Sequence, residues 1–597
     1  MLYAIGTVVS KKFDGKAYSG EIVSYDEKRE VYSISYEDGD EEEMYEEEIG
    51  DYIVYEVVSD QDEADDQNEA GQQIANETET ANTAAKPTKQ SLSFLRVLIG
   101  AFVAWILAIA VVVISDEAPS HHAESLPDYL QPFRPVGIKV INAIGIILAE
   151  VGLIDKVMSL DPDYLIRSAC SRLGQAHPRT HCVLLDEDKY WHASFHRLTG
   201  SLQEAKLTML GRIIAQGQVL GMLETRGRLL EAFDSEPEAA AAPISDPVFV
   251  VGLPRSGTTF LSRLLAIDPG NRGPTLWEYM DPVPRPPSPP PSNASKANIE
   301  SYEIKTKKRI AEQQWKLDQY KSLAPGVDSM HPLEATNPEE CIIIMNYAMD
   351  SEQVAVTYPI HEYMTWLLGF DHHKDVLRWN KRVLQHLQYA DPYGPRRWVV
   401  KTPYYLTMLD DIRSVYPNAK IIHTHRDPAE SILSVSSVIS KLQGIVTDDI
   451  DLQRIGAQQK AIHETMVEKA LQVRKKWAEE NIGANSNSEF RVVDVHLKDL
   501  QRSPVKTVKM IYKALFDTAL APETALMMQG WLKQNPRTKH GTHEPTMSEF
   551  GLENIMKSKV FSEYVDVFGA KGAASLSKEQ EQQKMLNHEA ELAQGEL

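Results

Sequence analysis

A short stretch near the middle of the chain combines residues suited to binding an anion. Gly252 and Gly257 have the G-x-x-x-x-G spacing of a phosphate-binding loop, but Thr258 stands where a nucleotide-hydrolysing loop carries its lysine. Such a loop still offers backbone N–H groups and a helix N-terminus, which suit an anion such as a nucleotide 5′-phosphate. Arg255 supplies a cation inside the loop. The sequence therefore predicts nucleotide binding without an obvious ATPase.

The elements that would position this loop belong to an alternating pattern. Short apolar, β-branched runs predict four strands, at residues 248–251, 398–401, 419–426 and 490–496. A helical pattern follows each strand, and this alternation predicts a parallel α/β sheet. Ligands of such sheets bind at the carboxyl ends of the strands, where Arg255, Lys401 and Arg426 all fall. We therefore expect these three cations at one edge of the sheet.

Taken together, the motifs resemble those of PAPS-dependent sulfotransferases. That group carries P-R-[ST]-G-T-T-x-L, then L-L-A-x-D-P, then W-E and a Pro-rich loop. The matching segments here are residues 254–261, 264–269, 277–278 and 281–291. In addition, Arg426 with Ser434 eight positions later is similar to the family's 3′-phosphate element. The resemblance covers roughly residues 160–570 and includes both ends of the nucleotide.

The resemblance implies a P-loop-like parallel sheet flanked by helices, with PAPS as sulfate donor and no metal. PAPS carries a 5′-phosphosulfate and a 3′-phosphate, so the site needs two anion-binding regions. At the 5′-phosphate the family pattern implies Arg255, Ser256, Gly257, Thr258 and Thr259. At the 3′-phosphate it implies Arg426 and Ser434, together with a C-terminal basic segment that contains Arg537, Lys539 and Gly541.

Transfer of the sulfuryl group requires cations for the leaving phosphate and a base for the acceptor hydroxyl. Lys401 and Arg255 are the expected cations. Cytosolic members of the family carry a histidine where this chain has Pro403, whereas membrane-anchored relatives use a glutamate near the position of Glu278. We therefore expect Glu278 to be the base. The alternatives are Glu339, Glu340 and His331.

One apolar segment predicts a membrane anchor. Residues 97–114 carry no charge and, with the two preceding apolar residues, reach the roughly 20 residues that a bilayer requires. Basic residues precede this segment and acidic residues follow it, which places the N-terminus in the cytosol. We expect a single-pass type II protein, in the Golgi, with a lumenal catalytic domain. Residues 137–154 predict an amphipathic helix on the domain or the bilayer surface; a second crossing is the alternative, and it would return that domain to the cytosol.

The N-terminal part has a different composition. Short β-rich runs separated by turn signals in residues 3–54 resemble Tudor-like barrels, which bind methylated side chains in aromatic cages. Phe13, Tyr18, Tyr32 and Tyr36 are the cage residues if one exists, although a simple barrel core is the favoured interpretation. Much of the net charge of -23 lies in this acidic region, so nucleic acid is not an expected partner.

The expected organisation has six parts: a small all-β barrel (1–56), an acidic disordered linker (57–92), a transmembrane helix (93–115), a helical stem (116–240), the catalytic domain (241–570) and a polar tail (571–597). For the three cysteines, free thiols are favoured over a Cys170–Cys182 bridge. The expected function is sulfuryl transfer to a hydroxyl of a glycan, protein or small molecule. The alternative is a membrane adaptor that binds a peptide through its barrel and carries a degenerate nucleotide domain.

Overall fold

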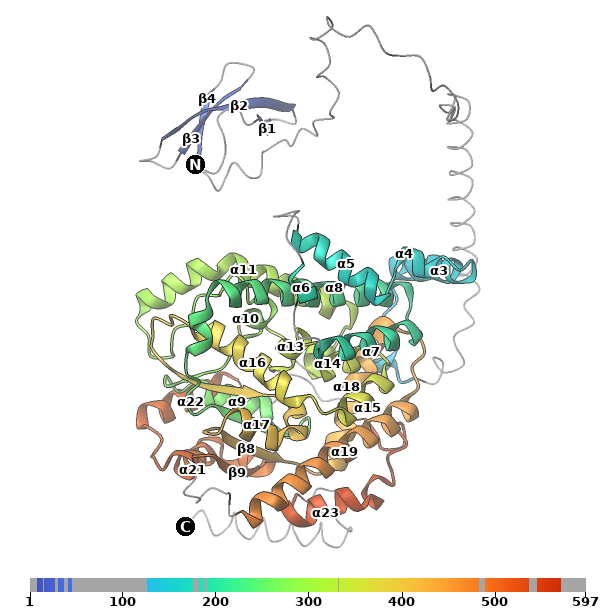
Figure 1. Cartoon of the computed structure of the whole chain (residues 1–597), viewed down its shortest axis with the longest axis vertical. Coiled ribbons are helices and arrows are strands. Elements are labelled where there is room, and N and C mark those ends of the chain that lie inside the picture. Colours follow the sequence, from blue (N-terminus) through green and yellow to red (C-terminus); the bar gives the residue numbers. More distant parts are fainter. Residues whose placement is uncertain are drawn as a thin grey trace, which may run out of the picture. The chain divides into compact units, whose positions relative to one another are not determined.

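The structure is a computed structural model (Figure 1). It describes residues 8–13, 16–26, 31–36, 41–45, 126–174, 182–186, 190–330, 332–480, 482, 489–535 and 545–570. The expected linker, membrane span and polar tail lie outside these residues. The chain divides into two units, residues 1–88 and 89–597, and each is considered by itself.

The first unit contains a four-stranded antiparallel sheet in the order β1-β2-β3-β4. Its strands are β1 (Val8–Phe13), β2 (Lys16–Asp26), β3 (Val31–Tyr36) and β4 (Glu41–Tyr45). A register shift between Ile22 and Ser24 marks a bulge in β2, and Ile34 on β3 is fully buried. The order agrees with the expected succession of short strands joined by turns. The side chains of the four expected cage aromatics lie outside the described part of this unit, so the cage stays a prediction.

The second unit is built on a five-stranded parallel sheet in the order β6-β7-β5-β8-β9, which confirms the expected α/β class. The strands are β5 (Val248–Gly252), β6 (Asn271–Arg272), β7 (Arg397–Lys401), β8 (Lys420–His425) and β9 (Arg491–His496). In the register, Val250 is opposite Lys401 and Gly252 is opposite Thr424. The carboxyl ends of the three central strands therefore meet at one edge.

Alternation along the central strand sends side chains into two separate cores. On β5, Val248 and Val250 belong to one hydrophobic cluster, while Phe249 and Val251 belong to another. The smaller core is closed by α9 (Thr258–Leu265), α21 (Pro504–Phe516) and α22 (Pro522–Gln534). Because both faces are covered, every residue of β5 is buried.

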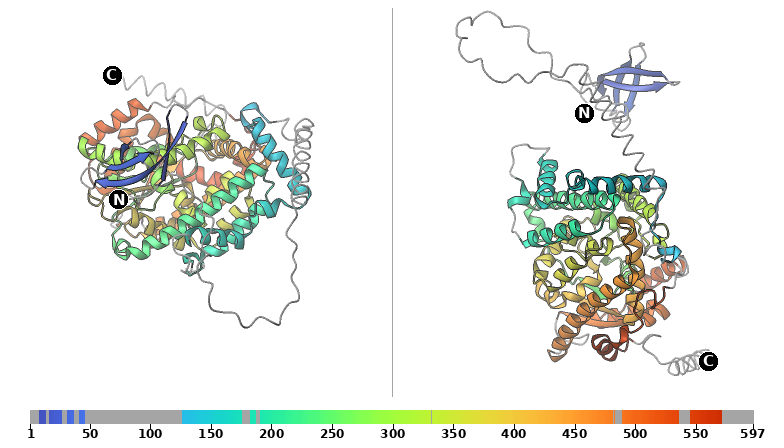
Figure 2. Two further views of the ribbon diagram at one scale, coloured as in Figure 1. Left: turned by 90° about the horizontal axis from the view of Figure 1, so that it is seen from above. Right: turned by 90° about the vertical axis from the view of Figure 1, so that its right-hand side faces the viewer.

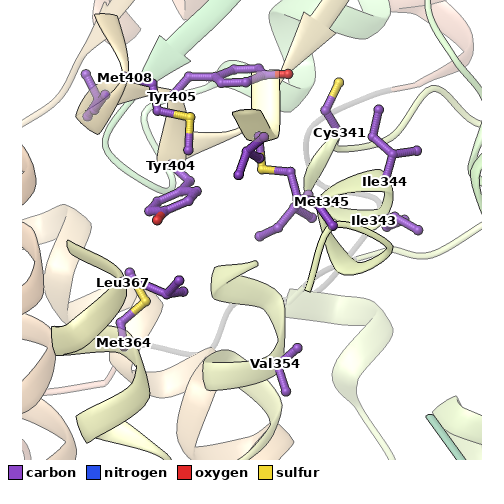
Figure 3. Packing of buried hydrophobic residues seen from close by; sticks show 14 of the residues in the cluster. Cys341, Ile343, Ile344, Met345, Val354, Met364, Leu367, Tyr404, Tyr405 and Met408 are labelled. Carbon is purple, nitrogen blue, oxygen red and sulfur yellow. The ribbon is translucent and has the colours of Figure 1, made fainter. Parts of the chain in front are cut away.

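The larger core is covered by helices from most of the remaining chain. These are α10 (Leu276–Met280), α11 (Lys296–Leu323), α12 (Val327–Met330), α13 (Ile342–Asn346), α14 (Glu352–Thr357), α15 (His361–Gly369), α16 (His373–Gln388), α17 (Leu409–Val415), α18 (Pro428–Val446), α19 (Leu452–Glu479) and α23 (Lys559–Phe568). The short η5 (Pro403–Thr407) follows β7, η7 (Ile555–Lys557) precedes α23, and α20 (Leu497–Arg502) follows β9. Figure 3 shows the side chains around α13 beside Tyr404 and Tyr405 of η5 in this core.

The predicted stem packs into the same core. Its elements are η2 (Asp128–Leu130), α3 (Val136–Glu150), α4 (Ile154–Val157), α5 (Pro162–Leu173), α6 (Val183–Asp186), α7 (Tyr190–Glu204), α8 (Met209–Ser235) and η4 (Pro237–Ala241). Figures 1 and 2 show α3, α5, α8 and α11 along one side of the unit, with β8 and β9 toward the other. Gly211 at the start of α8 leaves no room for a Cβ, which would lie 2.1 Å from the carbonyl oxygen of Val446. The absence of a side chain at Gly211 therefore allows the start of α8 to pack directly against the end of α18.

Helix α3 packs against α8 with one side and exposes apolar residues on the other. A Cβ on Gly145 would meet Met209, and Asn142 accepts a hydrogen bond from the backbone of Leu210 at 3.1 Å. Among the described residues, no single helix combines the length and apolar composition needed to cross a bilayer. Two helices bent by 115°, Val136–Glu150 and Ile154–Leu173, pass that test only as a pair.

The cysteines differ from the favoured expectation. Cys170 at the end of α5 and Cys182 before α6 form a disulfide with a Cα–Cα distance of 5.5 Å, and Cys341 is a buried free thiol. The sequence had favoured free thiols at Cys170 and Cys182, and for these two residues that prediction is wrong. The bridge forms because α5 and α6 both pack against α8, which brings two cysteines 12 positions apart into reach.

Candidate active site

The phosphate-binding loop has the backbone that its glycines require. Gly257 has φ 93° and precedes α9, and Gly252 has φ 152°. A Cβ on Gly252 would lie 2.3 Å from Oγ1 of Thr424, so the close approach of β5 to β8 needs glycine there. The first N–H groups of α9 have no intrahelical acceptor and point out of the helix N-terminus. Thr258 and Thr259 on this turn line a large cavity.

Ser256 is an exception among the expected loop ligands. Its hydroxyl donates to the carbonyl of Leu253 at 2.6 Å and lies 2.6 Å from Oγ1 of Thr424, and the side chain is fully buried. Its backbone N–H also donates to Leu253. These bonds hold the turn closed, so the geometry gives Ser256 a structural role and does not turn its hydroxyl toward a phosphate.

The two expected arginines lie side by side. Arg426 donates from Nη1 to the backbone carbonyl of Arg255 at 3.0 Å, and Arg255 donates from Nε to Oγ of Ser434 at 3.3 Å. Burial, followed by the charge of Arg426, lowers the pKa of Arg255. Two guanidinium groups this close repel one another, so an anion between them would be stabilised. The sequence-predicted residues Arg255, Arg426 and Ser434 therefore form one site.

Lys401 is enclosed by polar partners at the end of β7. Its ammonium group lies 2.8 Å from Oγ1 of Thr259, 2.5 Å from Oε1 of Glu340 and 3.2 Å from Oε1 of Glu339. Its side chain is only 1% exposed, whereas both glutamates and Thr259 line the cavity. Glu339 also pairs with Arg263 at 3.3 Å. Lys401 therefore lies between Thr259 of the phosphate loop and the two carboxylates.

Glu278 does not occupy the position expected of a base. It is 0% exposed and caps α10, where Oε2 accepts hydrogen bonds from the backbone and hydroxyl of Thr275, both at 2.9 Å. Its other oxygen pairs with Arg272 at 2.7 Å. Within the described part of the chain, the carboxylates on the cavity wall near Lys401 are instead Glu339, Glu340 and Glu352. The geometry therefore corrects the expectation for Glu278.

Glu352 is a site residue that sequence reasoning missed. Burial, followed by the nearby Glu340, raises the pKa of its carboxyl group to about 8, and Thr402 donates to it at 3.5 Å. In the sequence this glutamate is only an acidic residue at a helix start, where it favours the helix dipole. From the sequence, Glu340 is likewise interpreted mainly as an acidic residue that favours the start of a helix. Only the approach of α13 and α14 to the end of β7 brings the two carboxyl groups together.

The cavity that joins these groups has a volume of about 1980 Å³. It extends from the phosphate loop and Arg426 past the glutamates to α8 and α18. Pockets for single small ligands are typically about 300–1,000 Å³. The cavity therefore has room for a nucleotide and a second substrate. Arg537, Lys539, Gly541 and His331 lie outside the described residues, so their expected roles stay predictions.

A pair of histidines on β8, His423 and His425, contacts Arg474 and Asp494. His423, His425 and Asp494 place one ligand atom each within 4.8 Å of one another. Arg474 donates two hydrogen bonds to the carboxylate of Asp494, at 2.7 and 2.8 Å, and one to His423 at 3.1 Å. Although burial opposes it, these donors hold the pKa of Asp494 below its ordinary range. The guanidinium already supplies the positive charge here, and we assign no metal to this group.

The parallel sheet, the phosphate-binding loop and the paired arginines define an α/β domain with a candidate anion-binding site at the carboxyl ends of its strands. Residues 247–516 match the family model of the sulfotransferase family, so the chain contains a sulfotransferase-like domain. Residues 6–53 match the PTM/DIR17-like Tudor domain.

Solved structures of sulfotransferases share this fold. Sulfotransferase STF1 from Mycobacterium tuberculosis H37Rv is 25% identical, with a TM-score of 0.54 over 67% of this chain and 98% of that chain. Sulfotransferase STF9 from Mycobacterium avium is 23% identical, with a TM-score of 0.56 over 68% of this chain and 97% of that chain. A search of curated proteins gave no significant match.

Proposed function

We propose that the second unit transfers a sulfuryl group from PAPS to a hydroxyl acceptor. The observation that carries this proposal is the contact of buried Lys401 with Glu340 and Thr259, because it links a cation to a carboxylate and to the phosphate loop, both of which line the cavity. The match to the sulfotransferase family over residues 247–516 supports the reaction class.

The residues present fit the donor. Arg255, Arg426 and Ser434 would hold its phosphates, and the N–H groups at the start of α9 would bind further phosphate oxygens. The repulsion between the two guanidinium groups is relieved when an anion lies between them, and this argues for a phosphorylated ligand. The bound donor supplies an activated sulfuryl group whose leaving group is a phosphate.

The chemistry then assigns roles to the charged groups. The acceptor oxygen forms a bond to sulfur while the bond between sulfur and the phosphate oxygen breaks, and the bonding electron pair leaves with the phosphate. Glu340 takes the proton of the acceptor hydroxyl. Lys401 stabilises the charge that grows on the leaving oxygen, with Arg255 beside it. Transfer of this proton from Glu340 to solvent then returns the carboxylate to its ionised starting state.

Glu340 is a better base than its two neighbours on geometric grounds. Glu339 is shared between Lys401 and Arg263, which hold it in the wall. Glu352 keeps its proton to about pH 8, so at neutral pH it is mainly an acid. Glu340 contacts Lys401 alone among the ion pairs of the described residues and faces the cavity.

Nucleotide binding tests the proposal directly. The purified full chain is titrated with PAP, the nucleotide product, by calorimetry, with AMP as the control that lacks the 3′-phosphate. We expect PAP to bind more tightly than AMP because Arg426 and Ser434 have a phosphate to bind. Equal weak binding of both nucleotides, with no sulfate transfer from labelled PAPS, would contradict the proposal.

We also propose that the protein is a single-pass type II membrane protein of the Golgi, with the part of the second unit that follows residue 115 in the lumen. The uncharged run at residues 97–114 and the charges around it support this orientation. The Cys170–Cys182 bridge suits an oxidising lumen, and Asn293 in the sequon Asn293-Ala-Ser295 is exposed. Protease protection on microsomes tests the orientation: a protected N-terminus and a cleaved second unit would contradict it.

The Tudor match favours a second, separate function for the first unit. We propose that it binds a peptide, since Tudor-like barrels bind methylated side chains. The full chain is titrated with methylated and unmethylated lysine and arginine peptides. Binding of only the methylated forms is expected, and indifference to methylation would remove the aromatic cage from consideration.

A further inference from the structure

The cavity has two chemically different parts. Around the phosphate loop its wall is polar and cationic, with Arg255, Thr258 and Arg426. Beyond the glutamates α8 and α11 bring Glu224, Arg228, Glu312 and Lys316 to the wall, and the rest of it is formed mainly by aliphatic and methionine side chains from α8, α13, α14, α15 and α18. Six residues represent this part, which we call the apolar chamber: Met222, Ile342, Ile343, Val356, Met364 and Ile439.

The proposed base lies at the boundary of the two parts. Glu340 is followed along the chain, two and three residues later, by Ile342 and Ile343, and Glu352 begins the helix that carries Val356. An acceptor whose hydroxyl reaches Glu340 from the side away from the nucleotide must therefore place its body in the apolar chamber. The volume beyond what a nucleotide needs is large enough for a substantial molecule.

Several polar side chains on the chamber wall make hydrogen bonds within the protein, although Oδ1 of Asn346 accepts none from the described residues. Tyr347 donates to the carbonyl of Tyr279 at 2.8 Å, Asn346 donates to Gln353 at 2.5 Å, and Thr357 donates to the carbonyl of Gln353 at 3.3 Å. A glycan would bring many hydroxyl groups against aliphatic side chains, and burying hydroxyls without new partners is unfavourable. An apolar body needs none of these bonds and gains from leaving water.

The outer surface of the same helical layer is also apolar. Helix α8, which carries Met222 on the chamber, packs against α3, and α3 and α4 expose Val136, Ile146 and Val157 at 72%, 48% and 48%. Exposed apolar side chains of this kind suit the boundary between lipid headgroups and acyl chains, where a lipid alcohol resides. The surface and the chamber thus favour the same chemical class of substrate.

From these observations we infer that the acceptor is a lipid alcohol, a single reacting hydroxyl on a large apolar body. This inference rests on the proposed sulfuryl transfer. A long-chain alcohol and a sterol share this chemistry, and the test has a separate arm for each.

The test uses the full chain in detergent micelles with PAP bound. Binding of the fluorescent sterol dehydroergosterol and of a fluorescently labelled long-chain alcohol is measured first. Sulfate transfer from labelled PAPS is then compared for cholesterol, 1-hexadecanol, a tyrosine peptide and lactose. We expect binding and sulfation in at least one lipid arm and neither for lactose or the peptide. If PAP binds while neither lipid is sulfated, the inference is overturned, and sulfation of the peptide or lactose would leave the proposed function standing. If PAP itself fails to bind, the proposed function falls first.

Two neighbouring isoleucines provide matched variants. Ile343 lines the chamber, while Ile344 is fully buried in the core beside it. Ile343→Ala should raise KM for the lipid acceptor by about tenfold, the effect typical of a lost contact in an apolar pocket, with PAP affinity unchanged. Ile344→Ala should lower thermal stability and leave this KM unchanged. Equal KM changes in both variants would show a general packing defect and would contradict the assignment of Ile343.

Discussion

The ammonium group of Lys401 donates a hydrogen bond to the carboxylate of Glu340 at 2.5 Å. Lys401 ends β7 and Glu340 precedes α13, 61 positions away, and the two residues meet beside Thr259 of the phosphate loop. In the proposed reaction, the cation that serves the leaving group is thereby held beside the carboxylate that accepts the proton.

Replacement of the proposed base should remove turnover and spare nucleotide binding. A positioned general base contributes about 10²–10⁴-fold in rate, so Glu340→Gln should lower kcat by that range. PAP affinity, measured by calorimetry, should change little because the phosphate contacts lie on Arg255 and Arg426. Glu362→Gln, on an exposed glutamate of α15, is the control. Normal turnover in Glu340→Gln would assign the proton transfer to another group.

Glu278 should behave as a structural residue. Removing one partner of a buried ion pair costs about 3–5 kcal/mol, so Glu278→Ala should lower the free energy of unfolding in urea by an amount of this order. The pair with Arg272 and the cap on α10 are lost together. The folded fraction, assayed at low temperature, should keep its kcat. A Glu278→Gln variant with unchanged stability and no turnover would instead restore the expectation from the family resemblance.

The raised pKa of Glu352 predicts the direction in which the stability of the protein changes with pH. In the unfolded chain the carboxyl ionises at its ordinary value of 4.5, whereas in the folded protein it remains protonated to about 8. Folding therefore takes up a proton between these values, and this residue's contribution to stability falls as pH rises from about 4.5 to 8. Each pKa unit corresponds to about 1.4 kcal/mol.

Glu352→Gln should flatten that dependence. The Tm of the variant should exceed that of the unchanged protein at pH 8 and approach it near pH 4.5, as followed by differential scanning calorimetry. The exposed Glu362→Gln variant should track the unchanged protein at both values. Parallel Tm curves for Glu352→Gln and the unchanged protein would mean that Glu352 ionises normally in the folded state.

Loss of the second guanidinium should weaken nucleotide binding. A hydrogen bond to a charged group contributes about 1.5–3 kcal/mol, so Arg426→Ala should raise the Kd for PAP roughly 10- to 100-fold. The rise in Tm caused by saturating PAP should shrink accordingly. Arg378→Ala, on the exposed surface of α16, is the matched control. The same Kd in both variants would remove Arg426 from the phosphate site.

The disulfide should be present in protein from an oxidising compartment. Peptide mapping after alkylation without reduction should recover Cys170 linked to Cys182 and Cys341 as the alkylated thiol. A bridge closing a short loop stabilises a protein by about 3 kcal/mol in the chain-entropy model, so reduction should lower Tm. Cys341→Ser serves as the control because Cys341 forms no bridge. Recovery of all three cysteines as thiols in secretory-pathway protein would contradict the pairing.

Much of the fold follows from local pattern. The apolar, β-branched runs at residues 248–251, 398–401, 419–426 and 490–496 predicted four of the five parallel strands, because buried strands need apolar residues. The glycine spacing also predicted the loop, whose left-handed Gly257 and crowded Gly252 allow no ordinary side chain. The turn residues between the short β-rich runs likewise predicted the strands of the first unit.

The arrangement across the cavity was not readable from pattern. The sequence by itself determined the cations at the strand ends, since Lys401 ends β7, Arg426 follows β8 directly and Arg255 comes three residues after β5. Only the tertiary structure decided which carboxylate they meet: Glu278, next to the loop in the chain, is tied to Arg272, while Glu340 and Glu352 arrive from distant helices. The physical reason is that a carboxylate's role depends on its partners and burial, which are set by contacts between residues far apart in sequence.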